Sequence, residues 1–124
     1  MAKQRPIRVF LLDDVPAMRL VLRTVLELDG IEVVGESGDG AAGIDEIARL
    51  RPDVVVLDLS MPGLDGLEAI PLIHERAPET RIVVFSGFAR TQMGELALSR
   101  KAERYVEKGE PLERVREAIL ELAA

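Results

Sequence analysis

The amino-acid sequence predicts an α/β fold in which a parallel β-sheet is covered by helices on both faces. Short apolar runs alternate five times with segments of helical periodicity, which is typical of this architecture. The run Val54–Leu57 is continuously apolar and mostly β-branched, as expected for a strand that is buried on both faces. The chain has 124 residues, of which 48% are hydrophobic, so it can bury one core. We therefore expect a single domain over residues 1–124.

The first strand is predicted over residues 7–12 and the first helix over residues 16–28. Apolar side chains in this helix recur at intervals of three and four residues. Pro16 suits the first turn, where no amide hydrogen is needed, and Gly30 supplies a stop signal after the helix. The second strand is predicted over residues 31–35.

The second helix is predicted over residues 41–50. It ends before Pro52, because the residue that precedes a proline avoids the helical region. The third strand follows over residues 54–58. The third helix, over residues 67–77, contains Pro71, which has no backbone donor, so we expect a kink or a delayed regular start.

Two further strand–helix pairs are predicted in the rest of the chain. The fourth strand covers residues 81–86, and the short fifth strand covers residues 105–106. Between them, a helix over residues 91–100 contains Gly94, which weakens it by about 1 kcal/mol relative to alanine. The last helix is predicted over residues 111–122, with a proline at its first position and an acidic residue in its first turn.

This alternation predicts a flavodoxin-like (βα)5 three-layer sandwich with a five-stranded parallel sheet in the order 2-1-3-4-5. The first and third strands then lie side by side, where open α/β sheets bind their ligands. Both end in acidic residues, because Asp13 and Asp14 follow the first strand and Asp58 ends the third. Ser86 ends the fourth strand, and Lys108 follows the fifth. We expect all of these side chains to converge at the carboxyl edge of the sheet.

Carboxylates gathered at one edge favour a bound cation. Two carboxylates about 4 Å apart repel each other by roughly 4 kcal/mol at an effective dielectric constant of 20. Mg²⁺ relieves such repulsion, since it binds carboxylate oxygens, water and phosphate. Taken alone, Asp13 and Asp14 are equally typical of a helix cap, and Asp58 of a turn. Their combination with Lys108 favours a site that handles phosphate.

Four segments resemble the receiver domain of two-component response regulators. They are LLDD at residues 11–14, VVLDLSMPGLDG at 55–66, VVFSG at 83–87 and YVEK at 105–108. The resemblance covers nearly the whole chain. It implies a signalling domain that accepts a phosphoryl group and catalyses only its own phosphorylation and dephosphorylation.

The resemblance also implies roles for single residues. Asp58 would be the phosphoacceptor. Asp14 and Asp58 would bind Mg²⁺ directly, together with the main-chain carbonyl oxygen of Ser60. Asp13 would act on the metal through a water molecule, and Lys108 would pair with the phosphoryl oxygens.

Ser86 and Tyr105 would form the switch pair. The Ser86 hydroxyl would turn toward the phosphate, and the aromatic ring of Tyr105 would follow it inward. The surface of the fourth helix, fifth strand and last helix would then signal to an output domain or a partner protein. Serine stands at position 86 where threonine is commoner in the family, and Lys101 and Arg104 stand where glycine is common. These departures affect the signalling surface more than the acidic residues.

A histidine kinase or a histidine phosphotransfer protein is the expected phosphoryl donor. The resemblance places its contact on the exposed part of the first helix (Val15, Met18, Arg19 and Leu22) and on the loop over residues 108–111. A homodimer that forms on phosphorylation is among the partners that the resemblance allows. We expect no output domain within these 124 residues.

Composition argues against other partners. The formal net charge of -6 disfavours direct nucleic-acid binding by this domain. The apolar runs are far shorter than the roughly 20 residues of a membrane span, and the basic N-terminus is not followed by a signal-peptide pattern. The chain has no cysteine, which fits the cytoplasmic location that we expect. The cluster of Arg100, Lys101 and Arg104 is interpreted either as a solvated face or as a docking surface for an acidic partner.

Specific residues argue against two other functions. A Mg²⁺-dependent phosphatase with an aspartyl-phosphate intermediate usually carries a second aspartate two residues after the nucleophile, where this chain has Ser60. A docking module that works without phosphorylation has no need of the three acids and Lys108. His74, the only histidine, is interpreted as a helix-surface residue rather than a phosphorelay donor or a metal ligand.

Overall fold

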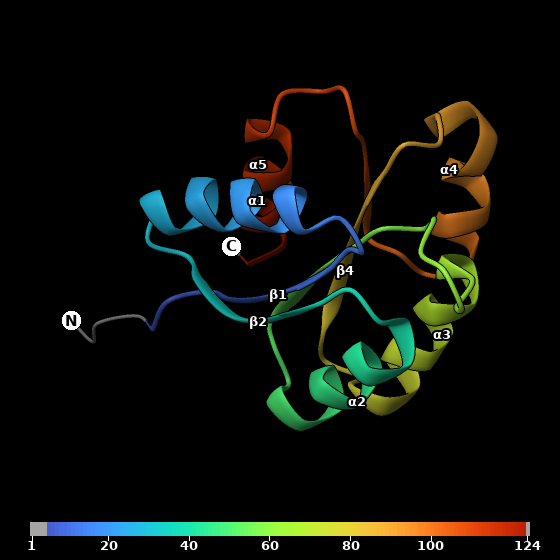
Figure 1. Cartoon of the computed structure of the whole chain (residues 1–124), viewed down its shortest axis with the longest axis horizontal. Helices are drawn as coiled ribbons and strands as arrows, with labels where there is room; N and C mark the ends of the chain where they lie inside the picture. Colours follow the sequence, from blue (N-terminus) through green and yellow to red (C-terminus); the bar gives the residue numbers. More distant parts are fainter. Residues whose placement is uncertain (1–4, 124) are drawn as a thin grey trace.

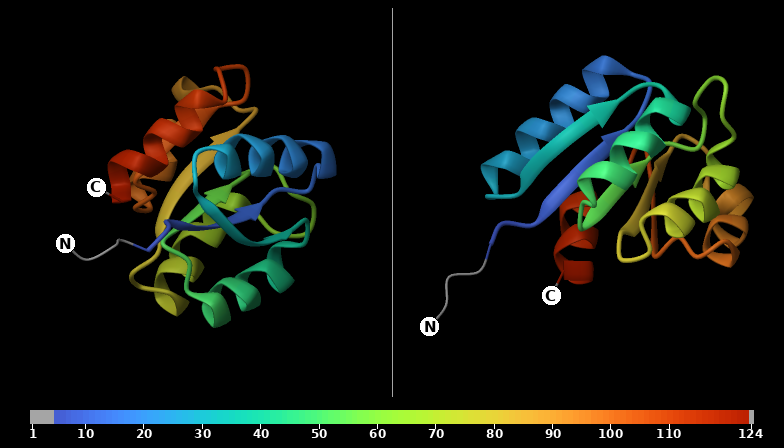
Figure 2. Two further views of the ribbon diagram at one scale, coloured as in Figure 1. Left: turned by 90° about the vertical axis from the view of Figure 1, so that its left-hand side faces the viewer. Right: turned by 90° about the horizontal axis from the view of Figure 1, so that it is seen from below.

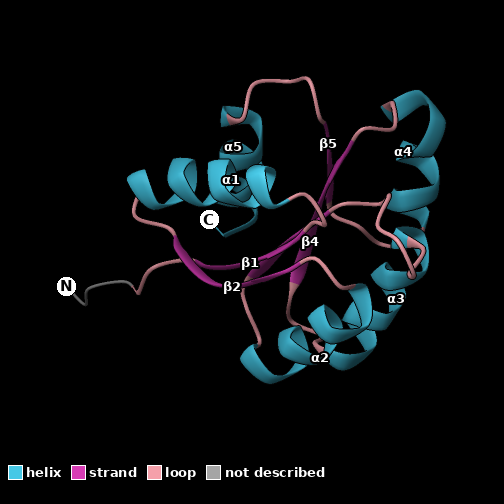
Figure 3. Ribbon diagram, viewed as in Figure 1, coloured by secondary structure: helices cyan, strands magenta, loops and turns pink. Residues whose placement is uncertain are grey.

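The computed structural model describes residues 5–123, in which five strands alternate with five helices (Figure 1; Figure 3). The strands are β1 (Arg8–Leu12), β2 (Glu32–Ser37), β3 (Val54–Leu57), β4 (Arg81–Ser86) and β5 (Arg104–Glu107). The helices are α1 (Pro16–Leu28), α2 (Gly40–Leu50), α3 (Gly66–Arg76), α4 (Arg90–Ser99) and α5 (Glu113–Ala123). Every predicted element is present, with ends that differ by at most two residues. Residues 1–4 and 124 of the predicted domain lie outside the described residues.

The strands form one parallel sheet in the order β2-β1-β3-β4-β5, which confirms the predicted order. β1 pairs with β3 in a register that sets Leu12 opposite Leu57. The chain continues from these residues into Asp13 and Asp58, and the Asp58 amide donates to the carbonyl oxygen of Leu12 at 2.9 Å. The pairing of the two central strands therefore brings the two acidic loops together.

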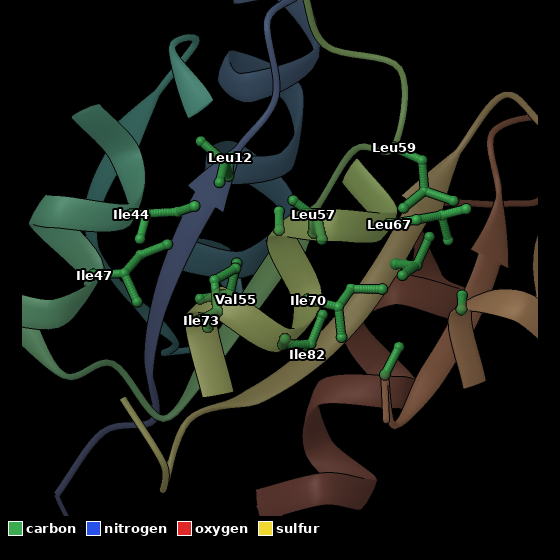
Figure 4. Close-up of a cluster of buried hydrophobic side chains, with 14 of the residues drawn as sticks. Leu12, Ile44, Ile47, Val55, Leu57, Leu59, Leu67, Ile70, Ile73 and Ile82 are labelled. Carbon is green, nitrogen blue, oxygen red and sulfur yellow. The ribbon is translucent and has the colours of Figure 1, made fainter. Parts of the chain in front are cut away.

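Helices cover both faces of the sheet (Figure 2). α1 and α5 pack on one face, whereas α2, α3 and α4 pack on the other. Alternate side chains of β1 enter opposite cores: Val9 and Leu11 face α1 and α5, and Phe10 and Leu12 face the other three helices. Figure 4 shows part of the core between the sheet and α2, α3 and α4, where Ile70 of α3 lies among residues of the strands. Within residues 5–123, no helix is long and apolar enough to span a membrane.

Two helices begin differently from the prediction. α3 begins at Gly66 and continues through Pro71, so the expected delay of its start is wrong. Proline is tolerated in the second turn because only one backbone hydrogen bond is lost there. α5 begins at Glu113 instead of residue 111, because the preceding turn is tighter than an α-helix. In that turn the Arg114 amide donates to the carbonyl oxygen of Pro111, three residues back, at 2.9 Å.

The turn between α4 and β5 contains a strained residue. Lys101 has a positive φ of 75°, which costs a residue with a Cβ atom about 1–2 kcal/mol. Its carbonyl oxygen accepts a hydrogen bond from Nε2 of His74 on α3 at 2.7 Å. His74 thus lies at the helix surface, and its half-buried side chain also ties α3 to this turn.

We expect Lys101→Gly to raise the free energy of unfolding by about 0.5–1 kcal/mol, since glycine adopts a positive φ without strain. Urea unfolding at equilibrium measures this change. Lys101→Ala removes the charge but keeps the Cβ atom, so it should leave the stability unchanged within about 0.5 kcal/mol. Equal stabilisation by both substitutions would assign the effect to the lysine side chain and contradict the backbone explanation.

Candidate functional site

Three carboxylates meet at the carboxyl edge of the sheet, as predicted. Oxygen atoms of Asp13, Asp14 and Asp58 all lie within 4.8 Å of one another. Asp13 and Asp58 are each only 2% exposed, and Asp14 is half-buried. Burial strengthens the repulsion between these like charges because less water screens them. A positive charge among the three carboxylates therefore stabilises their ionised forms.

Lys108 supplies one positive charge. Its Nζ lies 3.0 Å from Oδ2 of Asp13 and 3.3 Å from Oδ2 of Asp58. Burial acts to lower the pKa of Lys108, but the hydrogen bond and charge of Asp13, reinforced by Asp58, outweigh it and raise that pKa. The main-chain amide of Lys108 donates to the carbonyl oxygen of Ser86 at 2.7 Å, which anchors the residue beside β4. One ammonium still faces three carboxylates, so negative charge remains in excess.

Donors from the following loops orient the two buried carboxylates. Oδ1 of Asp58 accepts from the Ser60 amide at 3.1 Å and from the Ser60 hydroxyl at 3.2 Å. Oδ1 of Asp13 accepts from the amide of Val15 at 2.9 Å. The N-cap residue of α1 is Val15, whose side chain makes no cap, so neither aspartate occupies the N-cap position.

The donor set fits a hard divalent cation. Carboxylate oxygens are the ligands that Mg²⁺ prefers, and an excess of negative charge favours a divalent ion over a second lysine. Asp13, Asp14 and Asp58 each offer one carboxylate oxygen, and these three oxygens lie within 4.8 Å of one another. The contribution of the main-chain carbonyl of Ser60 stays a prediction.

The predicted switch pair lies beside this cluster. Ser86 is fully buried at the end of β4, and Tyr105 of β5 is 7% exposed. The Tyr105 hydroxyl donates to the carbonyl oxygen of Phe88 at 2.8 Å, and the Phe88 amide donates to Oγ of Ser86 at 3.2 Å. Burial raises the pKa of the Tyr105 phenol, which keeps it a neutral donor at physiological pH. Both side chains therefore contact the same loop between β4 and α4.

Arg19 supports the acidic loop, a role that the sequence did not reveal. Its Nη1 donates to the carbonyl oxygen of Asp13 at 2.5 Å, and its Nε donates to Glu36 of β2 at 2.9 Å. Arg23 also binds Glu36, and these arginines lower the pKa of the Glu36 carboxyl, the Arg23 hydrogen bond most strongly. The prediction placed Arg19 on the exposed surface that contacts the phosphoryl donor. Its side chain is only 17% exposed, however, and is engaged in these contacts. Two arginines one helical turn apart beside an acidic loop were the available sequence signal.

The expected donor surface on α1 needs a second correction. Leu22 is fully buried against the sheet, so its predicted place on the exposed part of the helix is wrong. Val15, the N-cap residue, is exposed as expected at 44%, and Val21 of the helix is exposed at 43%. With Met18 and Lys108 they line an apolar hollow of about 330 Å³ between α1 and the loop after β5. This hollow lies directly beside the acidic cluster, because Lys108 belongs to both.

The sheet order, the buried aspartates and the lysine between them define the class of α/β signalling domains that act as receivers. The family described as the response regulator receiver domain matches residues 9–120. The chain belongs to this family and is the receiver of a two-component response regulator.

Known relatives agree with this assignment. The nitrate/nitrite response regulator protein NarL of Escherichia coli K12 is 36% identical over 125 residues, which cover 100% of this chain and 58% of NarL. The chemotaxis protein CheY of Thermotoga maritima is 32% identical over 112 residues, covering 90% of this chain and 93% of CheY. The receiver domain of NarL from Mycobacterium tuberculosis has a TM-score of 0.89 at 30% identity and covers 97% of this chain and 98% of that domain. The chain thus spans little more than half of E. coli NarL.

Enzymatic names among the relatives belong to much longer proteins. Protein-glutamate methylesterase/protein-glutamine glutaminase 3 of Myxococcus xanthus is 48% identical over 90 residues, but they make up only 25% of that protein. The matched part of this chain is therefore a signalling domain.

Proposed function

We propose that this receiver accepts a phosphoryl group on Asp58 in a reaction that depends on Mg²⁺. The observation that carries the proposal is the position of the Asp58 carboxylate, buried within 4.8 Å of two other carboxylates and 3.3 Å from the Lys108 ammonium. A carboxylate in this setting can act as a nucleophile toward phosphorus. Asp13, Asp14 and Asp58 would hold the metal, which supplies charge stabilisation for the phosphoryl oxygens when bound.

The chain's own residues account for the transfer step. A phosphohistidine of a histidine kinase or phosphotransfer protein brings its phosphorus to a carboxylate oxygen of Asp58. The oxygen–phosphorus bond forms as the phosphorus–nitrogen bond breaks, and the electron pair stays on the donor imidazole. Lys108 balances the charge that gathers on the phosphoryl oxygens. The apolar hollow suits the donor protein, because Lys108 lines it and also reaches the reacting carboxylate.

The new phosphate is proposed to act through the switch pair. It adds about -1.5 to -2 charges and strong acceptor oxygens next to Ser86. The Ser86 hydroxyl donates to it, and Tyr105 transmits the shift to the surface of α4, β5 and α5. An output domain in a longer chain, a separate protein or a second copy of the chain would read that surface. We propose a cytoplasmic location, with no direct nucleic-acid contact by this acidic domain.

A phosphatase that turns over a substrate is disfavoured by Ser60. Its hydroxyl donates to Asp58 at 3.2 Å and occupies the place where such enzymes carry an aspartate as acid and base. Serine cannot exchange a proton near neutral pH as a carboxyl group does.

Incubation with acetyl phosphate and Mg²⁺ tests the proposed function. We expect a mass gain of one phosphoryl group that maps to the peptide containing Asp58 and is lost when EDTA removes the metal. Tyr105 is the only tyrosine and the chain has no tryptophan, so the intrinsic emission should change in step with the mass. Phosphorylation elsewhere, or an equal gain in EDTA, would contradict the proposal.

A further inference from the structure

Arg90, the first residue of α4, joins this helix to the turn that carries Lys108. Its Nη2 donates to Oε2 of Glu110 at 3.0 Å and to the carbonyl oxygen of Tyr105 at 3.0 Å. Its main-chain amide donates to Oε2 of Glu107 at 3.0 Å. These bonds hold the N-terminus of α4 on the end of β5 and on the loop that follows.

The turn itself is closed by the same carboxylate. Oε2 of Glu110 accepts from the Glu107 amide at 2.7 Å, and the Glu110 amide donates to the carbonyl oxygen of Glu107 at 3.1 Å. Lys108 lies within this turn, and its Nζ reaches Asp58 at 3.3 Å. Asp58 is therefore linked to Arg90 through Lys108 and the turn over residues 107–110 that Glu110 closes.

Arg90 also acts on the switch pair. It binds the main chain of Tyr105, whose hydroxyl holds the carbonyl oxygen of Phe88 only two residues before Arg90. In this arrangement Oγ of Ser86 accepts from the Phe88 amide, which leaves the hydroxyl proton to be donated. The loop between β4 and α4 is thus held at both ends by groups from β5 and its following turn.

We propose that Arg90, Glu107 and Glu110 form a latch that keeps the β4–α4 loop in the arrangement that receives the phosphoryl group. This inference rests on the proposed role of Asp58. If the loop is already ordered, no free energy is spent on ordering it when the phosphoryl group binds. If the loop must first become ordered, the apparent affinity for the phosphoryl group is lower. The Arg90 and Glu110 side chains are 52% and 31% exposed, so each single contact is weak and the set acts together.

Beryllofluoride, an analogue of a phosphoryl group on a carboxylate, tests the latch. With saturating Mg²⁺, we expect Arg90→Ala to bind it about three- to ten-fold more weakly in calorimetric titration, as expected from the loss of several charge-assisted hydrogen bonds. Mg²⁺ affinity should stay unchanged, because Arg90 contacts none of the three acids. Amide hydrogen exchange over residues 86–90, measured without ligand, should become faster. Arg100→Ala, at the other end of α4, is the matched control and should change none of these.

A double-mutant cycle separates the latch from general destabilisation. Glu110→Gln keeps an acceptor for the Glu107 amide but removes the charge that Arg90 binds. The double variant Arg90→Ala/Glu110→Gln should bind beryllofluoride no more weakly than Arg90→Ala, since the contact is already lost. Additive losses, an unchanged affinity in Arg90→Ala, or a parallel loss of Mg²⁺ affinity would overturn the latch. If the wild-type chain fails to bind beryllofluoride, the role of Asp58 fails instead, and the ligand-free exchange rates still decide the latch.

Discussion

Asp58→Asn is expected to abolish phosphorylation by acetyl phosphate and at the same time to stabilise the metal-free fold. The amide of asparagine carries no negative charge and is not a nucleophile toward phosphorus. Its carbonyl oxygen can still accept the two hydrogen bonds that Ser60 donates to Asp58, so the loop should keep its shape. Intact-mass measurement in the presence of Mg²⁺ checks the first part.

The stability gain follows from the crowding of charge. Asp58 faces two other carboxylates, and each pair about 5 Å apart repels by roughly 3 kcal/mol at an effective dielectric constant of 20. Loss of the 3.3 Å contact between Lys108 and Asp58, about 5 kcal/mol on the same scale, offsets most of this relief. We therefore expect the free energy of unfolding in EDTA to rise by about 1–2 kcal/mol. Mg²⁺ stabilises the form that binds it more tightly, so the advantage of the variant should shrink as Mg²⁺ is added.

Asp39→Asn is the matched control for this substitution. Asp39 is the N-cap of α2 and accepts from the Ala42 amide at 2.9 Å, a role that asparagine fills equally well. Phosphorylation and stability should both stay at the wild-type level. A phosphorylated Asp58→Asn protein would point to another acceptor, and a destabilised one in EDTA would show that the contact with Lys108 outweighs the repulsion.

Gly66→Ala is expected to lower the free energy of unfolding by about 2–3 kcal/mol, the range of a severe overpacking change. A Cβ atom at this position would lie 2.4 Å from the Cα atom and 2.8 Å from the carbonyl oxygen of Leu59. Both are main-chain atoms, so no side-chain rotation can relieve the overlap. The start of α3 would have to move away from the loop that begins at Asp58. Urea unfolding measures the loss, and slower phosphorylation should accompany it because that loop carries the acceptor.

Gly87→Ala provides the comparison. A Cβ atom at Gly87 would meet no other atom within 4 Å among the described residues, and this glycine does not have a positive φ. The stability should therefore change by no more than about 0.5 kcal/mol. If the two substitutions cost the same, the close approach of Gly66 to Leu59 would not be the cause.

Hydrophobic patterns, together with the regular alternation of strands and helices, predicted every element because both can be recognised along the sequence itself. The ends of the elements were less certain, since they depend on partners far away in the sequence. β5 extends from Arg104 to Glu107 because these residues pair with Val83 and Ser86 of β4. Leu22 was misplaced for a different reason: its exposure was implied by the family resemblance, whereas the packing of α1 on the sheet buries it completely.

The partners of the supporting charges were beyond the reach of sequence patterns. Arg19 and Glu36 are 17 residues apart, and Arg90 and Glu110 are 20 residues apart. Separations of this size match neither the helical nor the strand repeat, and exposed charges are common on any surface. Their partners become visible only when the strands and helices are assembled.

The sequence by itself determined that Asp13, Asp14, Asp58, Ser86 and Lys108 share one edge of a sheet. That result needed only the order of the elements, because the carboxyl ends of parallel strands all lie on the same side. Only the tertiary structure decided that two of the acids are almost completely buried and that one ammonium lies within 3.3 Å of both. The physical reason is that distance and burial depend on the packing of both cores around the sheet, which no local stretch of the chain encodes.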